Sequence, residues 1–478
     1  MHDVAIIGAG VIGSGIAREL TRFRLDVAVI DKGSDAATGS SKANSGIVHG
    51  GYDAKPGTLK AKYNIAGNPM FEALSEELDF PFKRNGSLVL AFSEEETAGL
   101  EALLQRGTAN GVKGLAIINR QDLLLREPNL GPQVHAALDV PSGGIVCPYE
   151  MTIAHAENAA SNGATFYLNH HVDSIDRTAD GFRIVTPDRV IESRVLVNAA
   201  GVYADAINNM LSSDRLEIIP RRGEYFLMDR TESGLVSHTL FQLPGKMGKG
   251  VLVTPSVDGN ILVGPTSEDL PDKENVETTR DGLTRVTEMA LRDVAALPLG
   301  KTIASFAGLR AHCTRDDFVI GPVSDVPGML NVAGIESPGL SSAPAIHKDV
   351  AAMVVDILKP QPNPAFNPVR RAAHRFRHMT DAERRDAIAR DPNYGHMICR
   401  CESVTKAEVL AALRSPLGVR DLDAIKRRTR AGMGRCQAGF CSMRLPEIIA
   451  AETGIDITEV TKFGGGSRLL FFRNKAVL

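Results

Sequence analysis

Four of the six cysteines lie close together near the carboxyl end of the chain. Cys399 and Cys401 stand in "ICRCES", and Cys436 and Cys441 stand in "GRCQAGFC". Thiolates are the ligands that select zinc, copper(I) and iron–sulfur clusters. A one-residue spacing is tight for the cysteine pairs of structural zinc sites, and a four-residue spacing is at their upper limit. The pattern therefore favours an iron–sulfur cluster, with zinc or a redox-active pair as alternatives.

A glycine-rich turn near the amino end has the spacing of a dinucleotide site. In "DVAIIGAGVIGSGIAREL", Gly8, Gly10 and Gly13 occupy the G-x-G-x-x-G positions between a short apolar strand and an amphipathic helix. The first glycine permits the tight turn, the second lets a pyrophosphate approach the backbone, and the third lets helix and strand pack closely. Asp31 ends the next predicted strand, where an acid receives ribose hydroxyls. Strand, helix and acid together favour dinucleotide binding over a glycine turn that serves structure alone.

The loop after this acid indicates which dinucleotide is bound. Small and polar residues run from Thr38 to Gly51, which suits a backbone that passes close to a flat ligand. The stretch "NSGIVHGGYDAKPGTLKAK" resembles the FAD-dependent family that includes D-amino-acid oxidase, sarcosine oxidase, glycerol-3-phosphate dehydrogenase and L-2-hydroxyglutarate dehydrogenase. The resemblance extends over about residues 1–360 and implies FAD as the cofactor.

Three later segments match further parts of this family's FAD site, in the family's order. Val172, in "NHHVDSI", occupies the position whose backbone faces the adenine, and "SRVLVNAAGVYADAI" resembles the second cofactor motif. The helix that begins near Gly339 in "GIESPGLSSAPAIHK" would stabilise negative charge on reduced flavin through its amino end. The resemblance implies these cofactor contacts: Gly8, Gly10, Val11, Ile12, Gly13, Asp31, Lys32, Ser40, Ser41, Asn44, Ser45, Gly46, Val172, Ala199, Ala200, Gly201, Gly308, Pro338, Gly339, Leu340 and Ser341.

Four polar residues are candidates for contact with the substrate. Arg310, in "FAGLRAHC", matches the family arginine that faces the flavin, and its planar fork suits carboxylate and phosphate alike. His312 lies two residues further, on the same face of a predicted strand, and is either a substrate contact or a packing residue. Tyr225, in "RRGEYF", either donates to the substrate or caps the sheet. His49 either lies near the flavin ring or only holds its turn. We expect these four residues to form the catalytic group.

The spacing of the cysteines also resembles a known domain. The pattern C-x-C followed after thirty-four residues by C-x₄-C resembles that of the bacterioferritin-associated-ferredoxin-like domain, which binds a [2Fe–2S] cluster through its cysteines. The resemblance implies that the four cysteines are the ligands. Backbone N–H groups near "GMGRCQAG" would offset the negative charge of such a cluster. The basic run from Lys426 to Arg430 either helps in this or is a solvated helix face.

The secondary structure expected around these residues indicates an α/β cofactor domain and an α+β substrate domain. "IIPRRGEYFLMD", "GVLVTPSVDGNILVGPT" and "FVIGPV" alternate apolar and polar residues and carry hairpin signals, which favours a mostly antiparallel sheet over the flavin ring. We expect a discontinuous Rossmann-like FAD-binding domain over 1–75, 146–214 and 326–360, and a substrate domain over 76–145 and 215–325. The remainder divides into a linker over 361–395, a small helical [2Fe–2S] domain over 396–455, and a tail over 456–478 whose apolar residues pack back on the body.

The composition excludes several classes of partner. The chain has 478 residues, 43% of them hydrophobic, and a net charge of -3, which leaves no basic footprint for nucleic acid. No apolar run approaches the ~20 residues that span a bilayer. We expect a cytoplasmic protein that reaches the inner face of the membrane only through a partner. Cys147 and Cys313 lie outside the two cysteine pairs and are expected to be inert, as in a reducing compartment.

Together the motifs predict an FAD-dependent dehydrogenase that oxidises a small anionic hydroxy substrate. Electrons would leave through the [2Fe–2S] cluster to a protein acceptor or a quinone-linked partner subunit. "NSGIVHGGYDAKPGTLKAK", "RRGEYF" and "GLRAH" resemble glycerol-3-phosphate dehydrogenases, which implies sn-glycerol 3-phosphate as substrate and dihydroxyacetone phosphate as product. L-2-hydroxyglutarate or another 2-hydroxy acid is the first alternative, and an amine or amino acid is the second. A flavoprotein subunit that only transfers electrons is the alternative of another class.

Overall fold

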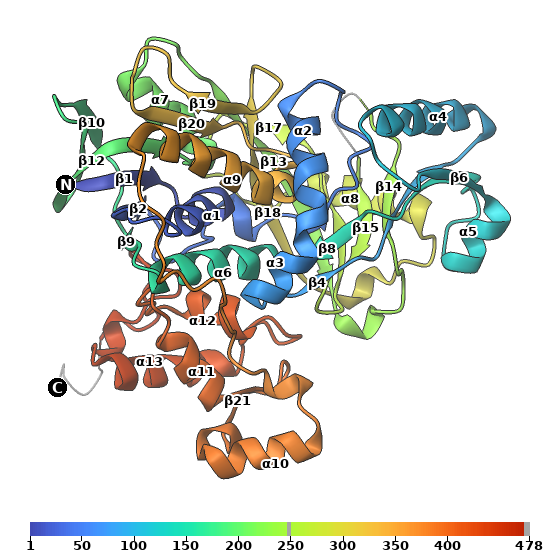
Figure 1. Ribbon diagram of the computed structural model, residues 1–478. Coiled ribbons are helices and arrows are strands. Elements are labelled where there is room, and N and C mark those ends of the chain that lie inside the picture. The colour runs from blue at the N-terminus through green and yellow to red at the C-terminus, as the bar shows by residue number, and fades with distance from the viewer. Residues whose placement is uncertain (246–249, 473–478) are drawn as a thin grey trace.

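The glycine turn stands on an eight-stranded sheet at the amino-terminal end of the chain (Figure 1). We analysed a computed structural model, which describes residues 1–245 and 250–472. Residues 246–249 of the expected substrate domain and 473–478 of the expected tail lie outside the described residues. The parallel strands of this sheet are β1 (His2–Ile7), β2 (Val27–Asp31), β9 (Thr165–Leu168), β12 (Arg189–Asn198) and β20 (Met329–Ala333). The antiparallel strands are β10 (Ser174–Arg177), β11 (Phe182–Thr186) and β19 (Val319–Pro322).

Three helices pack together beside this sheet and cover its apolar strands (Figure 1). α1 (Val11–Leu20) lies between α6 (Pro148–Ser161) and α9 (Gly339–Leu358). Because the glycine turn joins β1 to α1, the amino end of α1 opens at the carboxyl edge of the parallel strands. Ligands of doubly wound sheets bind at this edge.

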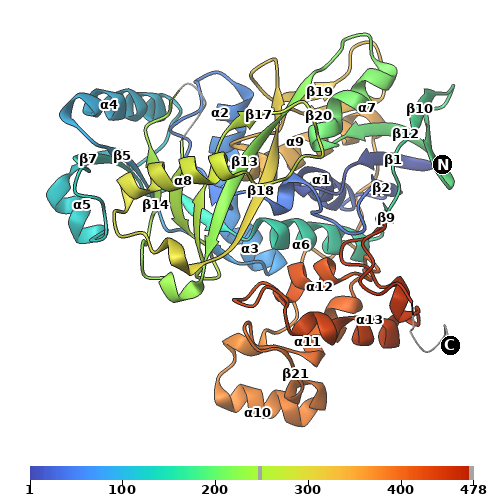
Figure 2. The ribbon, with the colours of Figure 1, turned by 180° about the vertical axis from the view of Figure 1, so that it is seen from behind.

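A second, nine-stranded sheet lies beside the first (Figure 2) and carries three of the expected substrate contacts, Tyr225, Arg310 and His312. Its longest pair joins Arg310 to Arg221 in antiparallel register. The strands are β5 (Ser87–Ala91), β6 (Ala116–Asn119), β7 (Ala136–Val140), β13 (Ile218–Met228), β14 (Thr239–Gln242), β15 (Leu252–Pro255), β16 (Ile261–Gly264), β17 (Glu268–Asp269) and β18 (Thr302–Cys313). The expectation that "FVIGPV" joins this sheet is wrong, because β19 pairs with β20 of the first sheet. An alternating pattern of four residues does not encode which sheet a strand joins.

Shorter elements complete these two layers. A three-stranded sheet joins β3 (Ile47–Val48), β8 (Gly144–Val146) and β4 (Phe82–Lys83). The remaining helices of this part of the chain are α2 (Leu59–Gly67), α3 (Phe71–Leu78), α4 (Glu94–Ala109), α5 (Arg120–Arg126), α7 (Ala204–Leu211) and α8 (Arg280–Asp293). None of the helices within residues 1–245 and 250–472 is long and apolar enough to cross a membrane.

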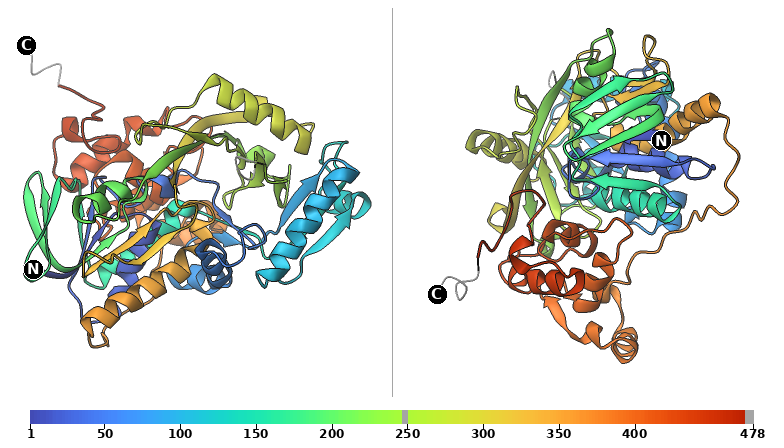
Figure 3. Two further views of the ribbon diagram at one scale, coloured as in Figure 1. Left: turned by 90° about the horizontal axis from the view of Figure 1, so that it is seen from above. Right: turned by 90° about the vertical axis from the view of Figure 1, so that its left-hand side faces the viewer.

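The carboxyl-terminal part forms a small helical unit below α6, reached by a chain segment that runs down the outside of the molecule from α9 (Figure 3). Capping boxes at Thr380 and Thr405 start its helices, and Gly454 ends the last one in a left-handed conformation. Its elements are α10 (Asp381–Arg390), β21 (Met397–Cys399), β22 (Val404–Thr405), α11 (Lys406–Leu413), α12 (Leu422–Thr429) and α13 (Leu445–Thr453). They enclose an apolar core of their own.

In this carboxyl-terminal part the structure excludes one of the two alternatives for the basic run and contradicts the expectation for the tail. Arg427, Arg428 and Arg430 are not a solvated helix face, because each guanidinium is 5% exposed and is paired with a carboxylate of the body. The apolar residues at the end of the described tail do not pack back on the body, since Phe471 and Phe472 are 74% and 71% exposed. Both departures have one cause: a composition pattern does not show whether another part of the chain covers it.

Candidate functional site

One large chamber lies between the two sheets and collects most of the predicted site residues. It has a volume of about 1540 Å³ and reaches from the glycine turn to the second sheet. Of the predicted cofactor and substrate contacts, Gly13, Ser341 and His312 do not line it. All the other predicted cofactor and substrate contacts, including His49, Tyr225 and Arg310, do, whereas the four cysteines lie elsewhere, in the carboxyl-terminal unit.

The glycine turn forms an anion-binding end of the chamber. Gly8 has a φ of +110°, and a Cβ there would lie 2.4 Å from the Ala199 carbonyl oxygen, so only glycine fits. The backbone N–H of Val11, at the start of α1, donates to Ser41 Oγ at 2.9 Å. The amino end of α1 and a hydroxyl thus meet at the position where the motif binds a pyrophosphate. Gly13 serves packing, as predicted, since a Cβ there would lie 1.9 Å from the Gly8 oxygen.

Asp31 is held at the same end by two backbone donors. Its Oδ2 accepts from the N–H of Ala9 and its Oδ1 from that of Gly33, both at 2.7 Å. Burial raises the pKa of Asp31 despite these two hydrogen bonds. The carboxyl is thereby fixed beside the turn, in the place that suits a ribose, and the donor set fits the adenosine diphosphate part of FAD.

The amino end of α9 forms the chamber wall at the other end. Pro338, Gly339 and Leu340 line the chamber, whereas Ser341 is buried and donates its hydroxyl to the Pro338 carbonyl at 2.9 Å. Ser341 therefore holds the turn. The positive end of the helix dipole faces the chamber and suits an anionic ring edge.

The second sheet supplies a cation at this end. The Arg310 guanidinium donates to the Thr266 carbonyl from both Nη atoms at 3.3 Å. No carboxylate pairs with it among the residues that the structure describes. The side chain lies over Gly223, where a Cβ would come within 2.9 Å of Nη2. An uncompensated guanidinium on the wall of a closed chamber is suited to an anionic ligand.

Tyr225 and His49 also line the chamber. The Tyr225 hydroxyl lies 3.2 Å from Ser45 Oγ, and its ring stacks on Phe306. His49 Nε2 lies 3.4 Å from Ser337 Oγ. Both side chains present a proton donor or acceptor to the same space as Arg310.

His312 is turned to a different partner. Its Nδ1 lies 3.0 Å from Glu336 Oε1, and the same oxygen accepts from Lys60 at 2.8 Å. Burial opposes ionisation of Glu336, but Lys60 and His312 hold the pKa of that carboxyl below its usual value. Glu336 lines the chamber and His312 does not, so His312 positions Glu336. Sequence reasoning missed Glu336, although it lies in the same "GIESPGL" turn as Gly339.

The four cysteines of the carboxyl-terminal unit form two pairs. Cys399 lies beside Cys441, and Cys401 lies beside Cys436. The two pairs are neighbours, because Cys401 also interacts electrostatically with Cys399, and Cys441 with Cys436. Two neighbouring thiol pairs suit the two irons of a [2Fe–2S] cluster, each with two cysteines. The backbone N–H groups of Gly432 and Glu402 approach Cys399, as expected for groups that offset the charge of a cluster.

A cluster of one thiol and two carboxylates elsewhere in the molecule is not suited to bind a metal cation. Cys147, Glu150 and Asp258 place one ligand atom each within 4.8 Å of one another. Arg375 pairs with Glu150, however, and Arg430 pairs with Asp258 at 2.7 Å. Their charges already compensate the carboxylates. Cys147 and Cys313, which were expected to be inert, are buried.

Comparisons with known proteins agree with both halves of this description. Residues 3–353 match the family model "FAD dependent oxidoreductase", and residues 397–451 match "BFD-like [2Fe-2S] binding domain". The chain is 50% identical over 475 residues to a glycerol 3-phosphate dehydrogenase of Caloramator mitchellensis, which covers 98% of each chain. It is 34% identical to a glycerol 3-phosphate oxidase of Mycoplasma genitalium, over 77% of this chain and 97% of that one.

A solved structure shares the fold of the larger, oxidoreductase part of this chain. The FAD-bound L-alpha-glycerophosphate oxidase of Mycoplasma pneumoniae superposes with a TM-score of 0.73 at 32% identity, covering 78% of this chain and 99% of that one. The predicted fold class and both predicted cofactors, FAD and a [2Fe–2S] cluster, are thereby confirmed. The chain belongs to the family of FAD-dependent oxidoreductases and carries a BFD-like [2Fe–2S] binding domain behind the oxidoreductase fold.

Proposed function

We propose that the protein is an FAD-dependent dehydrogenase that oxidises sn-glycerol 3-phosphate to dihydroxyacetone phosphate. The observation that carries the proposal is Arg310 on the wall of a chamber otherwise fitted to FAD, a guanidinium that pairs with no carboxylate within residues 1–245 and 250–472. The 50% identity to a glycerol 3-phosphate dehydrogenase over almost the whole chain supports this substrate.

The predicted residues have distinct tasks in this reaction. When bound, FAD supplies the hydride acceptor and the cluster a one-electron carrier. Arg310 binds the anionic group of the substrate and orients it. His49 accepts the hydroxyl proton at a ring nitrogen, and Tyr225 donates a hydrogen bond to the substrate. The residues of the glycine turn, of the two later cofactor motifs and of the α9 turn hold FAD, as the family resemblance implies.

The domain division expected from the sequence is part of the same proposal. The FAD-binding domain comprises 1–75, 146–214 and 326–360, the substrate domain 76–145 and 215–325, and the [2Fe–2S] domain 396–455. The location of the chamber between the two sheets supports a substrate that enters from the side of the second sheet.

A substrate panel tests the function. Glycerol 3-phosphate, L-2-hydroxyglutarate and an amino acid are each mixed anaerobically with the purified protein, and bleaching of the flavin absorbance is followed. Rapid bleaching by glycerol 3-phosphate alone is expected. Bleaching by the hydroxy acid alone would assign the alternative substrate, and none by any of them would favour a subunit that only transfers electrons.

We infer further that the electron acceptor is a protein with an acidic, partly apolar surface. Phe440 and Met443, which flank the ligand Cys441, are 79% and 76% exposed. Arg400, Arg435 and Arg444 are exposed in the same cysteine stretches, Arg435 in a pair with Asp229, and we call these five residues the cysteine-loop surface. Exposed apolar side chains accompanied by basic ones are typical of a docking site for an acidic partner.

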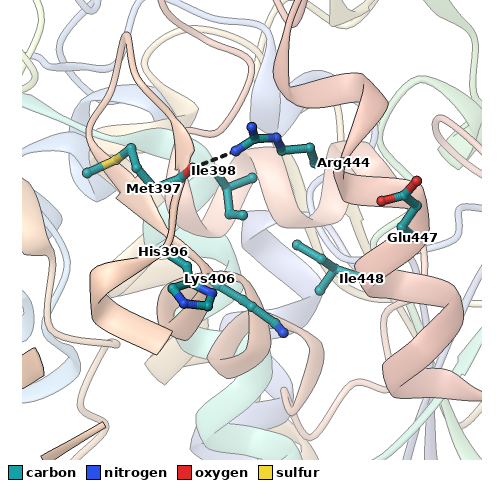
Figure 4. A pocket seen from close by; sticks show the side chains of 7 residues that line it. All are labelled: His396, Met397, Ile398, Lys406, Arg444, Glu447 and Ile448. Carbon is teal, nitrogen blue, oxygen red and sulfur yellow. Dashed lines mark hydrogen bonds between the residues drawn. The ribbon is translucent and has the colours of Figure 1, made fainter. Parts of the chain in front are cut away.

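A shallow hollow extends the cysteine-loop surface (Figure 4). It lies between β21 and α13, where Arg444 donates to the Met397 carbonyl at 3.0 Å. Lys406 and His396 also line it, beside the exposed carboxylate of Glu447. A partner bound here would lie close to the cysteines, which shortens the path for an electron. If this partner is a quinone-linked subunit, the protein works at the inner face of the membrane; if it is a free redox protein, it works in the cytoplasm.

A further inference from the structure

The FAD chamber is not closed by the oxidoreductase fold alone. Four residues of the carboxyl-terminal part line it: Asp423, Arg427, Lys462 and Phe463. They come from α12 and from the segment after α13, which lie beside α6 and below the first sheet (Figure 2). These residues reach the end of the chamber that holds the glycine turn. Ser34, three residues after Asp31, donates to the Phe463 carbonyl at 3.1 Å.

Arg427 is a buried cation with an unused donor at this place. Its guanidinium is 5% exposed and its Nη2 donates to Asp35 at 2.8 Å. Its Nε has no hydrogen-bond partner among the residues that the structure describes. Asp35 is shared with Arg428, which binds both of its oxygens, at 2.7 and 3.0 Å. Asp35 therefore does not compensate Arg427 in full, and a buried donor without a partner is costly.

Further cations face Arg427 across the chamber wall. Lys42 directly follows Ser41, the residue whose hydroxyl lies at the start of α1. Burial lowers the pKa of Lys42, and the charge of Arg427, with those of Lys462 and Lys426, lowers it further. Besides Asp35, the acids in this group are Asp423, which pairs with Lys462 at 3.2 Å, and Asp421, whose pKa burial raises despite the charge of Arg427. Such an excess of positive charge is unfavourable unless an anion binds beside it.

The diphosphate of FAD is an anion that the glycine turn already brings to this end of the chamber. We propose that the [2Fe–2S] domain forms part of the FAD site: Arg427 and Lys462 bind the diphosphate bridge from the side opposite the glycine turn. FAD binding and docking of the carboxyl-terminal domain then stabilise each other, because FAD makes its full set of contacts only when the two parts are docked.

Titration of the flavin-free protein with FAD tests this, with quenching of flavin fluorescence as the readout. Lys462→Gln changes a half-exposed side chain, and we expect the dissociation constant for FAD to rise about five- to tenfold. Arg427→Gln should raise it more than tenfold, and should make FAD binding less sensitive to salt. Arg414→Gln is the matched control in the same domain, because Arg414 is 67% exposed and pairs with Glu452; its constant should stay within about twofold of the wild type.

Competition by ADP and by adenosine identifies the group that is bound. ADP should lose affinity in the Lys462→Gln variant in the same proportion as FAD, whereas adenosine should bind both proteins alike. Equal FAD constants in wild type, Lys462→Gln and Arg427→Gln, with iron content and circular dichroism unchanged, would overturn the proposal. If Arg427→Gln does not fold, Lys462→Gln decides it, since that side chain is 50% exposed.

Discussion

At the scale of single residues, two neighbouring side chains of β18 have different tasks: one lines the chamber, and the other supports its wall. Arg310 and His312 are two residues apart on β18, yet Arg310 lines the chamber and His312 pairs with Glu336. The spacing places both on one face of the strand. Glu336 lies between His312 and the chamber, and Lys60 pairs with the same oxygen. The two residues therefore differ in task although they share a face.

Replacement of Arg310 separates these tasks. Arg310→Ala should lower kcat/KM for glycerol 3-phosphate about 100-fold, because a charge-assisted hydrogen bond to the substrate is worth ~2–3 kcal/mol. Arg310→Lys should recover part of the loss, since it keeps the charge without the fork. Bound FAD per chain serves as the check on folding. His312→Gln is the control and should cost less than about tenfold. A variant Arg310→Ala with wild-type turnover would exclude this chamber end as the substrate site.

At the scale of elements, the packing of α1, α6 and α9 buries two histidines between helices. His155 of α6 and His347 of α9 are 1% and 2% exposed, with ring centroids 5.0 Å apart. A Cβ on Gly15 of α1 would lie 2.0 Å from the His347 ring, so glycine makes the close approach of the helices possible. Burial lowers the pKa of both rings, that of His347 to about 3. Both imidazoles are neutral in the folded protein at neutral pH.

Stability should therefore fall as the solution becomes acidic. In the unfolded chain these histidines bind protons below about pH 6.5, and in the folded protein His347 does so only near pH 3. Above pH 6.5 neither histidine lowers the free energy of unfolding. Below pH 6.5, protonation of each histidine in the unfolded chain should lower the free energy of unfolding by about 1.4 kcal/mol per pH unit. Urea unfolding at pH 7.5 and 5.5 measures the difference. The His155→Gln/His347→Gln variant should lose most of that pH dependence; an unchanged slope would contradict the assignment.

At the scale of the whole molecule, a buried set of ion pairs joins the carboxyl-terminal unit to the body. Asp258 of the second sheet's layer accepts from Arg430 at 2.7 Å and pairs also with Arg377. Glu402, next to the proposed cluster ligand Cys401, accepts from Arg430 at 2.8 Å and from Arg377 at 3.0 Å. All four of these charged side chains are at most 10% exposed. The position of the cysteines relative to the chamber thus depends on charges from both parts.

Removal of one charge from this set should release the carboxyl-terminal unit. Asp258→Asn leaves two buried guanidinium groups with one carboxylate fewer, a change that costs ~3–5 kcal/mol. Unfolding followed separately by cluster absorbance and by flavin fluorescence should then show two transitions in place of one. Glu452→Gln breaks an exposed pair with Arg414 and should change stability by less than about 1 kcal/mol. Coincident transitions in Asp258→Asn would show that this set does not hold the two parts together.

The cysteine-loop surface gives a second prediction at this scale. Arg400 is exposed between Cys399 and Cys401, two of the proposed cluster ligands. Arg400→Glu should raise KM for an acidic protein acceptor about tenfold, with the difference shrinking at high salt, because rim charges act mainly on encounter. Bleaching of the flavin by glycerol 3-phosphate should stay at the wild-type rate and serves as the control. An unchanged KM for a series of acidic redox proteins would contradict the proposed surface.

The sequence by itself determined those features that depend on local spacing. Gly8, Gly10 and Asp31 could be assigned because a strand, a tight turn and a helix impose fixed distances along a short stretch of chain. The two cysteine stretches were predictable for the same reason. The family resemblance added the later cofactor segments, whose turns line the chamber in the expected order.

The tertiary structure alone decided which distant groups meet. It paired β19 with β20, turned His312 to Glu336, and placed Arg427 of the carboxyl-terminal unit at the FAD chamber. The basic run around Arg427 had the pattern of a solvated helix face, but its partners lie some hundreds of residues earlier in the chain. Charge and burial depend on what is packed opposite a side chain, and that surface is contributed by segments with no fixed distance in sequence.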